Sequence, residues 1–178
     1  MLIHKPIQEF TQRELYNLGI KSFSFDSREA QVGDLFCCLP GLHTDGHNYI
    51  DTARARGVKH FLVHDSSYEC DDEIHIVSGD TRRAMAVLSS IFYDVPSQRL
   101  SVIGVTGTDG KSTTTYLIQQ LISVHGYSCG MMSTINFKTG PQMQENLLRQ
   151  STPEAPQVEH APPNTCLLYT SPSPRDST

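Results

Sequence analysis

The residues with the clearest chemical meaning lie between Val102 and Thr115, where the sequence reads Val-Ile-Gly-Val-Thr-Gly-Thr-Asp-Gly-Lys-Ser-Thr-Thr-Thr. Gly107 and Gly110 can adopt backbone angles that side chains forbid, so the loop can direct its amide N–H groups around an anion. Lys111 adds a mobile cation, and the Ser112 hydroxyl stands where a phosphate-bound Mg²⁺ would be held. The segment therefore predicts a phosphate-binding loop whose nucleotide contacts come from Gly107, Thr108, Asp109, Gly110, Lys111 and Ser112.

The elements on either side of this loop support the prediction. An apolar run from Leu100 to Val105 precedes it, and a helical pattern from Ser112 to His125 follows it. The start of that helix directs its unpaired N–H groups and its positive dipole end at the loop. The usual phosphate-loop pattern has glycine where this chain has Val105. The alternative, a glycine-rich turn without a ligand, leaves Gly-Lys-Ser at a helix start unexplained.

This form of the loop resembles that of the Mur ligase family, the ATP-dependent enzymes that add amino acids to the UDP-linked peptidoglycan precursor. Within the family, the upstream sequence is most similar to the branch that attaches a diamino acid. The resemblance covers residues 20 to 160. The other matching segments, in the same order as in the family, are Asp26-Ser27-Arg28 with Gly33-Asp34-Leu35-Phe36, Leu39-Pro40-Gly41 with Asp45-Gly46-His47, and Ser151-Thr152-Pro153-Glu154.

The resemblance also implies the residues of a precursor-binding site. Ser27 takes the position of the serine that contacts UDP in relatives, and His43 belongs to the short loop that lies over the nucleotide. Ser151 and Thr152 match two hydroxyl residues that contact the muramoyl peptide. The resemblance therefore implies that Ser27, His43, Ser151 and Thr152 bind the UDP precursor.

Each of these segments also has a purely structural interpretation. Asp26 can cap a turn and pair with Arg28, and Ser-Thr before Pro-Glu is a common way to begin a helix. Asp45 precedes a helical pattern, so an N-cap is favoured over a catalytic pair with His47. Asp109 stands where many relatives have asparagine, and the sequence leaves open whether it serves the metal or faces away from the phosphates.

The resemblance implies an ATP-dependent, ADP-forming amide ligase of peptidoglycan biosynthesis, which serves cell-wall growth, cell shape and division. ATP would phosphorylate the D-glutamyl side-chain carboxylate of UDP-N-acetylmuramoyl-L-alanyl-D-glutamate, and the amine of a diamino acid would displace phosphate. Lys111, the loop amides and Mg²⁺ would neutralise charge in this reaction. A metal-binding glutamate, a carbamylated lysine and the diamino-acid motif of relatives lie downstream of the matched residues, so this chain alone is expected to be inactive.

Two other functions remain open at this stage. One is the neighbouring family branch that adds D-alanyl-D-alanine, although the Ser151-Thr152-Pro153-Glu154 segment favours the diamino-acid branch. The other is a non-catalytic module in which the loop only senses ATP. A downstream metal-binding glutamate would distinguish an enzyme from such a module.

Composition excludes several classes of protein. The net charge of −5 argues against a general nucleic-acid or membrane-surface binder. The sequence contains no apolar run that approaches the ~20 residues of a membrane span and no secretory signal, so we expect a cytoplasmic protein. We also expect a monomer. The five cysteines have no zinc or redox spacing, and we expect buried free thiols. Cys37 and Cys38 are adjacent in a strand pattern, so their side chains should point to opposite faces.

The alternation of strand and helix patterns predicts an α/β fold with two domains. Residues 1–97 would form a small UDP-precursor-binding domain, and residues 98–165 the start of a doubly wound ATP-binding domain, truncated in this chain. The boundary lies where Pro96-Ser97-Gln98-Arg99 interrupts the pattern. The expected strands are 23–25, 34–39, 58–64, 73–78, 100–105 and 128–133, and the expected helices are 6–17, 45–56, 80–93 and 111–125.

The last residues differ in character from the rest. Cys166 to Asp176 resembles the in-frame translation of a transposon-based sequencing adapter, so residues 166–178 are interpreted as a non-native tail. Prolines at 162, 163, 172 and 174 argue against regular structure there. We therefore expect the chain to be disordered after Ala161.

Overall fold

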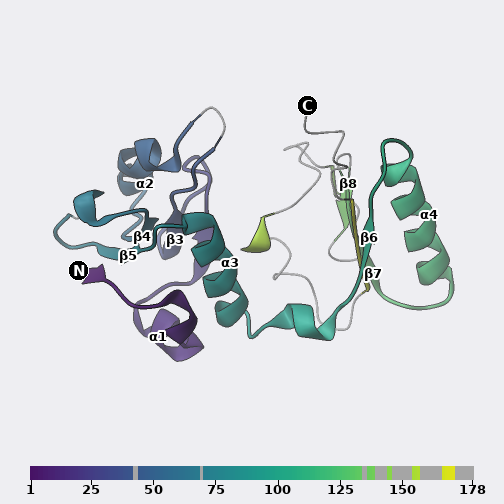
Figure 1. Cartoon of the computed structure of the whole chain (residues 1–178), viewed down its shortest axis with the longest axis horizontal. Helices are drawn as coiled ribbons and strands as arrows, with labels where there is room; N and C mark the ends of the chain where they lie inside the picture. The colour runs from purple at the N-terminus through teal and green to yellow at the C-terminus, as the bar shows by residue number, and fades with distance from the viewer. Residues whose placement is uncertain are drawn as a thin grey trace. The chain divides into compact units, whose positions relative to one another are not determined.

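The computed structural model describes residues 1–41, 44–68, 70–133, 136–138, 144–145, 154–156 and 166–170. Its internal contacts divide the chain into two compact units, Met1–Asp94 and Val95–Thr178. Both units combine helices with a sheet that contains parallel strands, so the expected α/β class is confirmed (Figure 1).

Unit 1 is built on a five-stranded, fully parallel sheet in the order β1-β5-β4-β3-β2. Its strands are β1 (Leu2–Ile3), β2 (Ser22–Ser24), β3 (Asp34–Cys37), β4 (His60–Val63) and β5 (Ile74–Val77). Its helices are α1 (Gln12–Asn17), α2 (Ile50–Ala55) and α3 (Thr81–Phe92), with 3₁₀ turns η1 (Ile7–Glu9), η2 (Gly46–Tyr49) and η3 (Ser66–Tyr68). Because the strands are parallel, their carboxyl ends meet at one edge of the sheet.

Two apolar cores cover the two faces of this sheet. On one face, Leu35 and Leu62 pack with the buried side of α3, which includes Met85 and Leu88. On the other face, Phe36 and Phe61 pack with α2. Cys37 belongs to the first core and Cys38 to the second, as strand alternation predicts. The sheet is therefore the middle layer of three.

Helix starts in unit 1 follow local capping rules. Thr11 and Glu14 form a complete capping box at α1, and the Asp80 side chain accepts from the Arg83 N–H at the start of α3. The predicted helix at 45–56 is instead a 3₁₀ turn followed by α2. Asp45 caps that turn by accepting from the His47 N–H, which confirms the N-cap interpretation.

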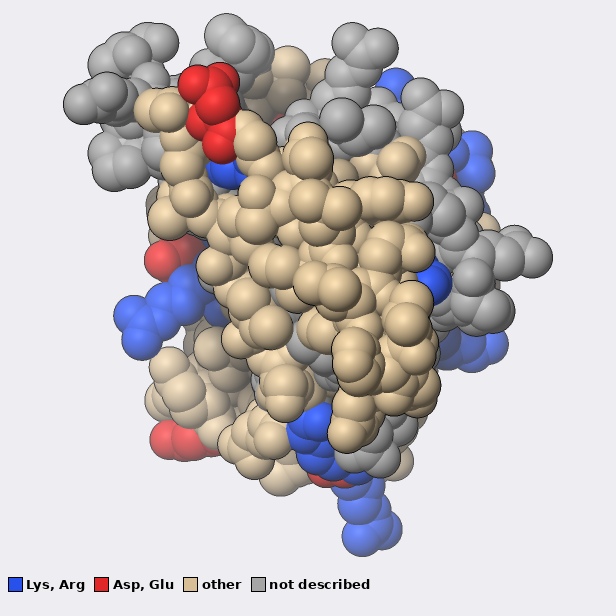
Figure 2. Space-filling model, turned by 90° about the vertical axis from the view of Figure 1, so that its right-hand side faces the viewer, with Lys and Arg blue, Asp and Glu red and all other residues tan. Residues whose placement is uncertain are grey.

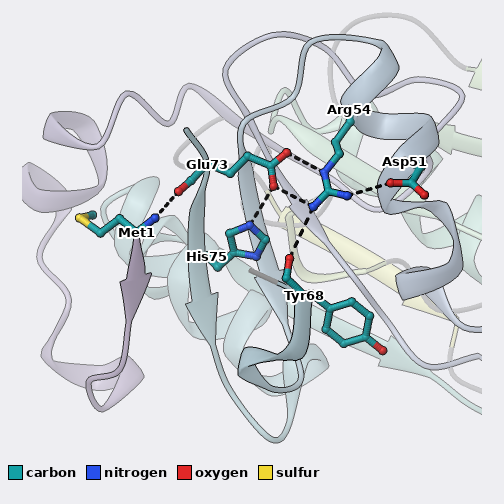
Figure 3. A network of polar contacts seen from close by, with 6 residues as sticks. All are labelled: Met1, Asp51, Arg54, Tyr68, Glu73 and His75. Atoms are coloured by element: carbon teal, nitrogen blue, oxygen red, sulfur yellow. Dashed lines mark hydrogen bonds and ion pairs between the residues drawn. The ribbon is translucent and has the colours of Figure 1, made fainter. Parts of the chain in front are cut away.

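A polar network beside the sheet connects α2 to the start of β5 (Figure 3). The Arg54 guanidinium donates to both carboxylate oxygens of Glu73, at 2.6 and 3.0 Å, and to Asp51 at 2.8 Å. The fully buried His75 donates from Nε2 to the same Glu73 carboxylate at 2.9 Å, and the Met1 amine donates to the Glu73 carbonyl. Burial alone raises the pKa of Glu73, but the hydrogen bonds from Arg54 and His75 lower it more, and the net pKa lies below its usual value.

Unit 2 contains a mixed sheet in the order β6-β10-β7-β8-β9. A short 3₁₀ turn, η4 (Pro96–Arg99), precedes β6 (Ser101–Val105), α4 (Lys111–Val124) and β7 (Cys129–Met132). The remaining strands are β8 (Asn136–Lys138), β9 (Gln144–Glu145) and β10 (Cys166–Thr170). β10 pairs in parallel with both β6 and β7, whereas β8 and β9 are antiparallel to their neighbours.

β10 contradicts the expectation that the chain is disordered after Ala161. Cys166 pairs with Ser101 on one side and with Cys129 on the other. The β6–α4–β7 crossover leaves space for one strand between β6 and β7, and the backbone groups that face this space need partners. The run Cys-Leu-Leu-Tyr-Thr contains no proline, because the prolines at 163 and 172 lie outside it, so it can supply those partners.

The outer side of α4 is almost free of charge. Residues 112 to 137 contain no Asp, Glu, Lys or Arg. Figure 2 views the molecule from the side on which α4 lies and shows a broad surface with few charged residues. The large apolar side chains exposed on and just after this helix are Tyr116, Leu117, Leu121, Val124 and Tyr127.

The cysteines are largely as expected, since Cys37, Cys38 and Cys129 are buried free thiols, but Cys70 is exposed. Burial raises the pKa of the Cys38 thiol to about 12, with a further contribution from the Asp45 charge. Cys38 is therefore an unreactive core residue. Within the described residues, no helix is long and apolar enough to cross a membrane.

The Arg54–Glu73 network gives a testable stability prediction. Glu73→Gln should lower the free energy of unfolding by about 1.5–3 kcal/mol near neutral pH, because it weakens charge-assisted hydrogen bonds to a half-buried guanidinium. Since the native pKa of Glu73 lies below the usual 4.5, this contribution is present above that value and is lost as the pH falls through the native pKa. Urea unfolding followed by far-UV circular dichroism should show the gap between wild type and variant closing in acid.

Asp51→Asn is the matched control, because the Asp51 side chain is 91% exposed and its ion pair with Arg54 should contribute little. A pH-independent gap for Glu73→Gln, or an equal loss for Asp51→Asn, would contradict this account of the network.

Candidate functional site

The predicted phosphate loop lies between the carboxyl end of β6 and the start of α4. Gly110 is the residue before the helix, and its backbone is left-handed, with φ 73° and ψ 2°. Gly107 also has a positive φ, 152°. Both angles are costly for residues with a Cβ. Glycine therefore stands at the two loop positions whose backbone angles disfavour a side chain, and α4 begins directly afterwards at Lys111.

The Lys111 side chain folds over its own loop. Its Nζ donates to the Gly107 carbonyl at 2.7 Å and to the Thr108 carbonyl at 3.3 Å. Thr108 and Asp109 are exposed, and Ser112 is half-buried in the first turn of α4. These contacts hold a cation beside the N–H groups at the start of a fourteen-residue helix, which is a suitable arrangement for a polyphosphate.

The Asp26-Ser27-Arg28 segment follows β2 at the carboxyl edge of the unit 1 sheet. Arg28 donates from Nε and Nη2 to the Asp26 carboxylate, and its backbone N–H donates to the same group at 2.9 Å. The side-chain hydrogen bonds from Arg28 outweigh the effect of burial and lower the pKa of Asp26. The structural interpretation of this pair is therefore confirmed. Ser27 is only 7% exposed, and its hydroxyl forms no hydrogen bond with any described residue.

The segment after β3 forms a narrow hairpin at the same edge. Pro40 and Asp45 form an antiparallel bridge, the Gly41 N–H donates to the Thr44 carbonyl, and the Gly46 N–H donates to the Leu39 carbonyl. The tip of the hairpin includes His43, which lies outside the described residues. Ser151 and Thr152 also lie outside them. Of the four predicted precursor contacts, the structure therefore places Ser27.

A cavity of about 450 Å³ opens beside this hairpin, and sequence reasoning did not identify it. Its lining residues follow the ends of three neighbouring parallel strands, which is the usual location of ligand sites in such sheets. The sequence contained a signal for this cavity, because its lining residues lie at or shortly after the ends of three expected strands. The lining residues are Pro40, Asp45, His47, His64, Tyr68, Gly79, Asp80 and Thr81.

The comparison with known families agrees with this arrangement in both units. Residues 14–93 match the Mur ligase family, catalytic domain, and residues 105–162 match the Mur ligase middle domain. The chain belongs to the Mur ligase family. The first match ends at the close of α3, and the second begins at the last residue of β6.

Named Mur ligases share much of this sequence. The chain is 40% identical over 144 residues to a UDP-N-acetylmuramyl-tripeptide synthetase of Roseiflexus sp., an alignment that covers 80% of this chain and 28% of that protein. It is 42% identical over 124 residues to a UDP-N-acetylmuramoyl-L-alanyl-D-glutamate--2,6-diaminopimelate ligase of Geobacillus kaustophilus, which covers 70% of this chain and 25% of the relative. The chain thus spans little more than a quarter of these Mur ligases.

Solved structures show the same fold. The MurF ligase of Thermotoga maritima in complex with ADP superposes with a TM-score of 0.60 at 21% identity, covering 90% of this chain and 34% of that one. At this identity the similarity establishes the Mur ligase fold and nothing finer.

The hairpin at this site depends on a close backbone approach at Gly46. A Cβ at this position would lie 2.6 Å from the Leu39 nitrogen and 3.0 Å from the Cys38 Cα. Gly46→Ala should therefore force the hairpin away from β3 and lower the free energy of unfolding by about 1–3 kcal/mol. Gly79→Ala, whose Cβ would meet no atom within 4 Å, should change it by less than about 0.5 kcal/mol. Urea unfolding of both variants decides the matter, and equal losses would contradict the close approach.

Proposed function

We propose that the protein to which this chain belongs is an ATP-dependent amide ligase that adds a diamino acid to UDP-N-acetylmuramoyl-L-alanyl-D-glutamate. The observation that carries the proposal is that one chain combines a parallel sheet with a cavity at its carboxyl edge in unit 1 and a Gly-Lys-Ser loop before α4 in unit 2. The two units match two successive Mur ligase domains. The relatives' names support the choice of substrates, since one is a 2,6-diaminopimelate ligase and another a tripeptide synthetase. This function also implies a cytoplasmic enzyme of peptidoglycan synthesis, and we propose a monomer.

The unit 2 loop fits ATP on its own geometry. The left-handed Gly110 allows the loop to enter α4 without a side chain in the phosphate position, and Lys111 already lies over the loop. In the complex we expect Lys111 Nζ to exchange its contacts with the Gly107 and Thr108 carbonyls for phosphate oxygens. A MurF structure with this fold is in complex with ADP, which supports nucleotide binding by the fold. Ser112 would hold Mg²⁺, which supplies further positive charge for the phosphates.

The unit 1 site fits the UDP end of the precursor. The Ser27 hydroxyl is nearly buried and has no described partner, so it can serve a ligand without breaking a bond within the protein. His43, Ser151 and Thr152 would complete the contacts. Arg28 is engaged with Asp26, so we assign it the role of shaping the turn around Ser27.

The reaction follows from the weak electrophilicity of a carboxylate. Transfer of the ATP γ-phosphoryl group to the D-glutamyl carboxylate converts an oxygen into a leaving group as phosphate. The diamino acid's amine then attacks the acyl carbon, and the C–O bond breaks as the amide C–N bond forms. Lys111 and the loop amides contribute by holding the polyphosphate and neutralising its charge.

Lys111 tests the nucleotide part of the proposal. Lys111→Ala should weaken ADP binding by this chain roughly ten- to a hundredfold, because charge-assisted hydrogen bonds are lost. In the longer protein it should abolish amide formation from ATP, the UDP-dipeptide and a diamino acid. Lys59→Ala, an exposed lysine of unit 1, is the matched control. Circular dichroism should show that both variants keep the wild-type fold. If Lys111→Ala binds ADP and turns over substrate as the wild type does, the role assigned to Lys111 is excluded.

Ser27 tests the precursor part. Ser27→Ala should reduce the affinity for UDP-N-acetylmuramoyl-dipeptide roughly ten- to a hundredfold through the loss of hydrogen bonds to charged oxygens. Ser67→Ala, on the exposed η3 turn, should leave the affinity unchanged. Isothermal titration of the two variants gives the comparison, and superimposable curves for Ser27→Ala and wild type would place the site elsewhere.

A further inference from the structure

His47 stands out in unit 1 because it is a buried histidine with both ring nitrogens engaged. It is 8% exposed and lies in η2, directly after the hairpin that follows β3. Its Nδ1 lies 2.6 Å from Asp45 Oδ1, and its Nε2 lies 2.9 Å from the backbone nitrogen of His64. The ring therefore links two segments that follow different strands of the sheet.

The partners determine which ring nitrogen donates and which accepts. The His64 backbone N–H can only donate, so Nε2 of His47 must be the acceptor. The proton of a neutral imidazole then lies on Nδ1, where it is donated to the Asp45 carboxylate. The Asp45 carboxylate also accepts from the His47 backbone N–H at 3.0 Å. The Tyr68 ring packs against the imidazole, with centroids 4.6 Å apart, and limits its rotation.

These bonds fix the base of the hairpin. Asp45 is one half of the bridge to Pro40, and His64 directly follows β4. The base of the hairpin is thus closed by the Gly46–Leu39 bond, two residues after β3, and linked by His47 to His64, the residue after β4. Without the imidazole, Asp45 would lose its link to the end of β4.

We propose that His47 is a positioning residue for precursor binding: through Asp45 its imidazole holds the base of the 40–45 hairpin, the segment that contacts the uridine nucleotide. The inference rests on the proposed function, because it assumes that this hairpin contacts the nucleotide. We assign the ring no direct chemical role, although it lines the cavity, because both of its nitrogens are engaged within the protein. It acts through Asp45 and the hairpin.

Two conservative variants separate the two bonds. The Asn amide can replace Nδ1, so His47→Asn retains a donor for Asp45 but cannot reach the His64 N–H. The Gln carbonyl can replace Nε2, so His47→Gln retains an acceptor for His64 but gives up the donor. His47→Ala removes both. His60→Gln is the control, because His60 donates to the Leu18 carbonyl from the opposite end of β4.

The experiment combines amide hydrogen exchange with UDP titration on the 178-residue chain. Each lost bond should raise the exchange rate of the Gly41 and Gly46 amides about three- to tenfold and weaken UDP binding by a similar factor. His47→Ala should show the largest effect, with Asn and Gln intermediate. Exchange of the β5 amides should be unchanged in all three, and His60→Gln should change neither the hairpin nor UDP affinity.

The two readouts keep this inference and the proposed function apart. If the exchange rates of the Gly41 and Gly46 amides are unchanged in His47→Ala, the positioning role is overturned, whatever the effect on UDP affinity. Faster exchange throughout unit 1, or the same loss of affinity in His60→Gln, also overturns it, because either would mean a general loss of stability. If the unsubstituted chain binds no UDP while the hairpin still loosens in His47→Ala, the nucleotide assignment of this hairpin fails and His47 is a purely structural brace.

Discussion

The parallel pairing of β2, β3, β4 and β5 is the constraint on which unit 1 depends. A parallel sheet brings every carboxyl end to one edge, and the connections must return over its faces. Ser27, the 40–45 hairpin, His64 and Asp80 are distant in sequence, yet each follows a strand and so meets the others at that edge. The cavity at this edge, and the precursor site that we propose there, are consequences of this pairing, whichever side chains line them.

Features set by neighbouring residues were predictable from the sequence. The strand, glycine-rich loop and helix start from Ser101 to Lys111 were predictable because the glycines, the lysine and the helix start lie within a few residues of one another. Asp80 as a cap and the opposite orientations of Cys37 and Cys38 follow from equally local rules. Such local patterns predict the folded structure correctly because they depend little on the rest of the chain.

Features set by distant pairing were not predictable. β1 is two residues long and is a strand only because Leu2 meets His75. β10 is a strand because a space between β6 and β7 accepts it, which the flanking prolines concealed. The role of His47 was likewise missed, because the sequence gives its relation to Asp45 but not to the His64 backbone. In each case the pairing partner is distant in sequence and comes close only through the strand order of the sheet.

The position of β1 at the end of the sheet has a consequence for synthesis on the ribosome. Leu2 and Ile3 are made well before their partners His75 and Ile76, and the Met1 amine bonds to the Glu73 carbonyl. At a translation rate of about 5–20 residues per second, the first strand must wait roughly 4–15 s for its partner to be made. During that interval β1 lacks its pairing partner, and the apolar residues Leu2 and Ile3 have no strand to pair with.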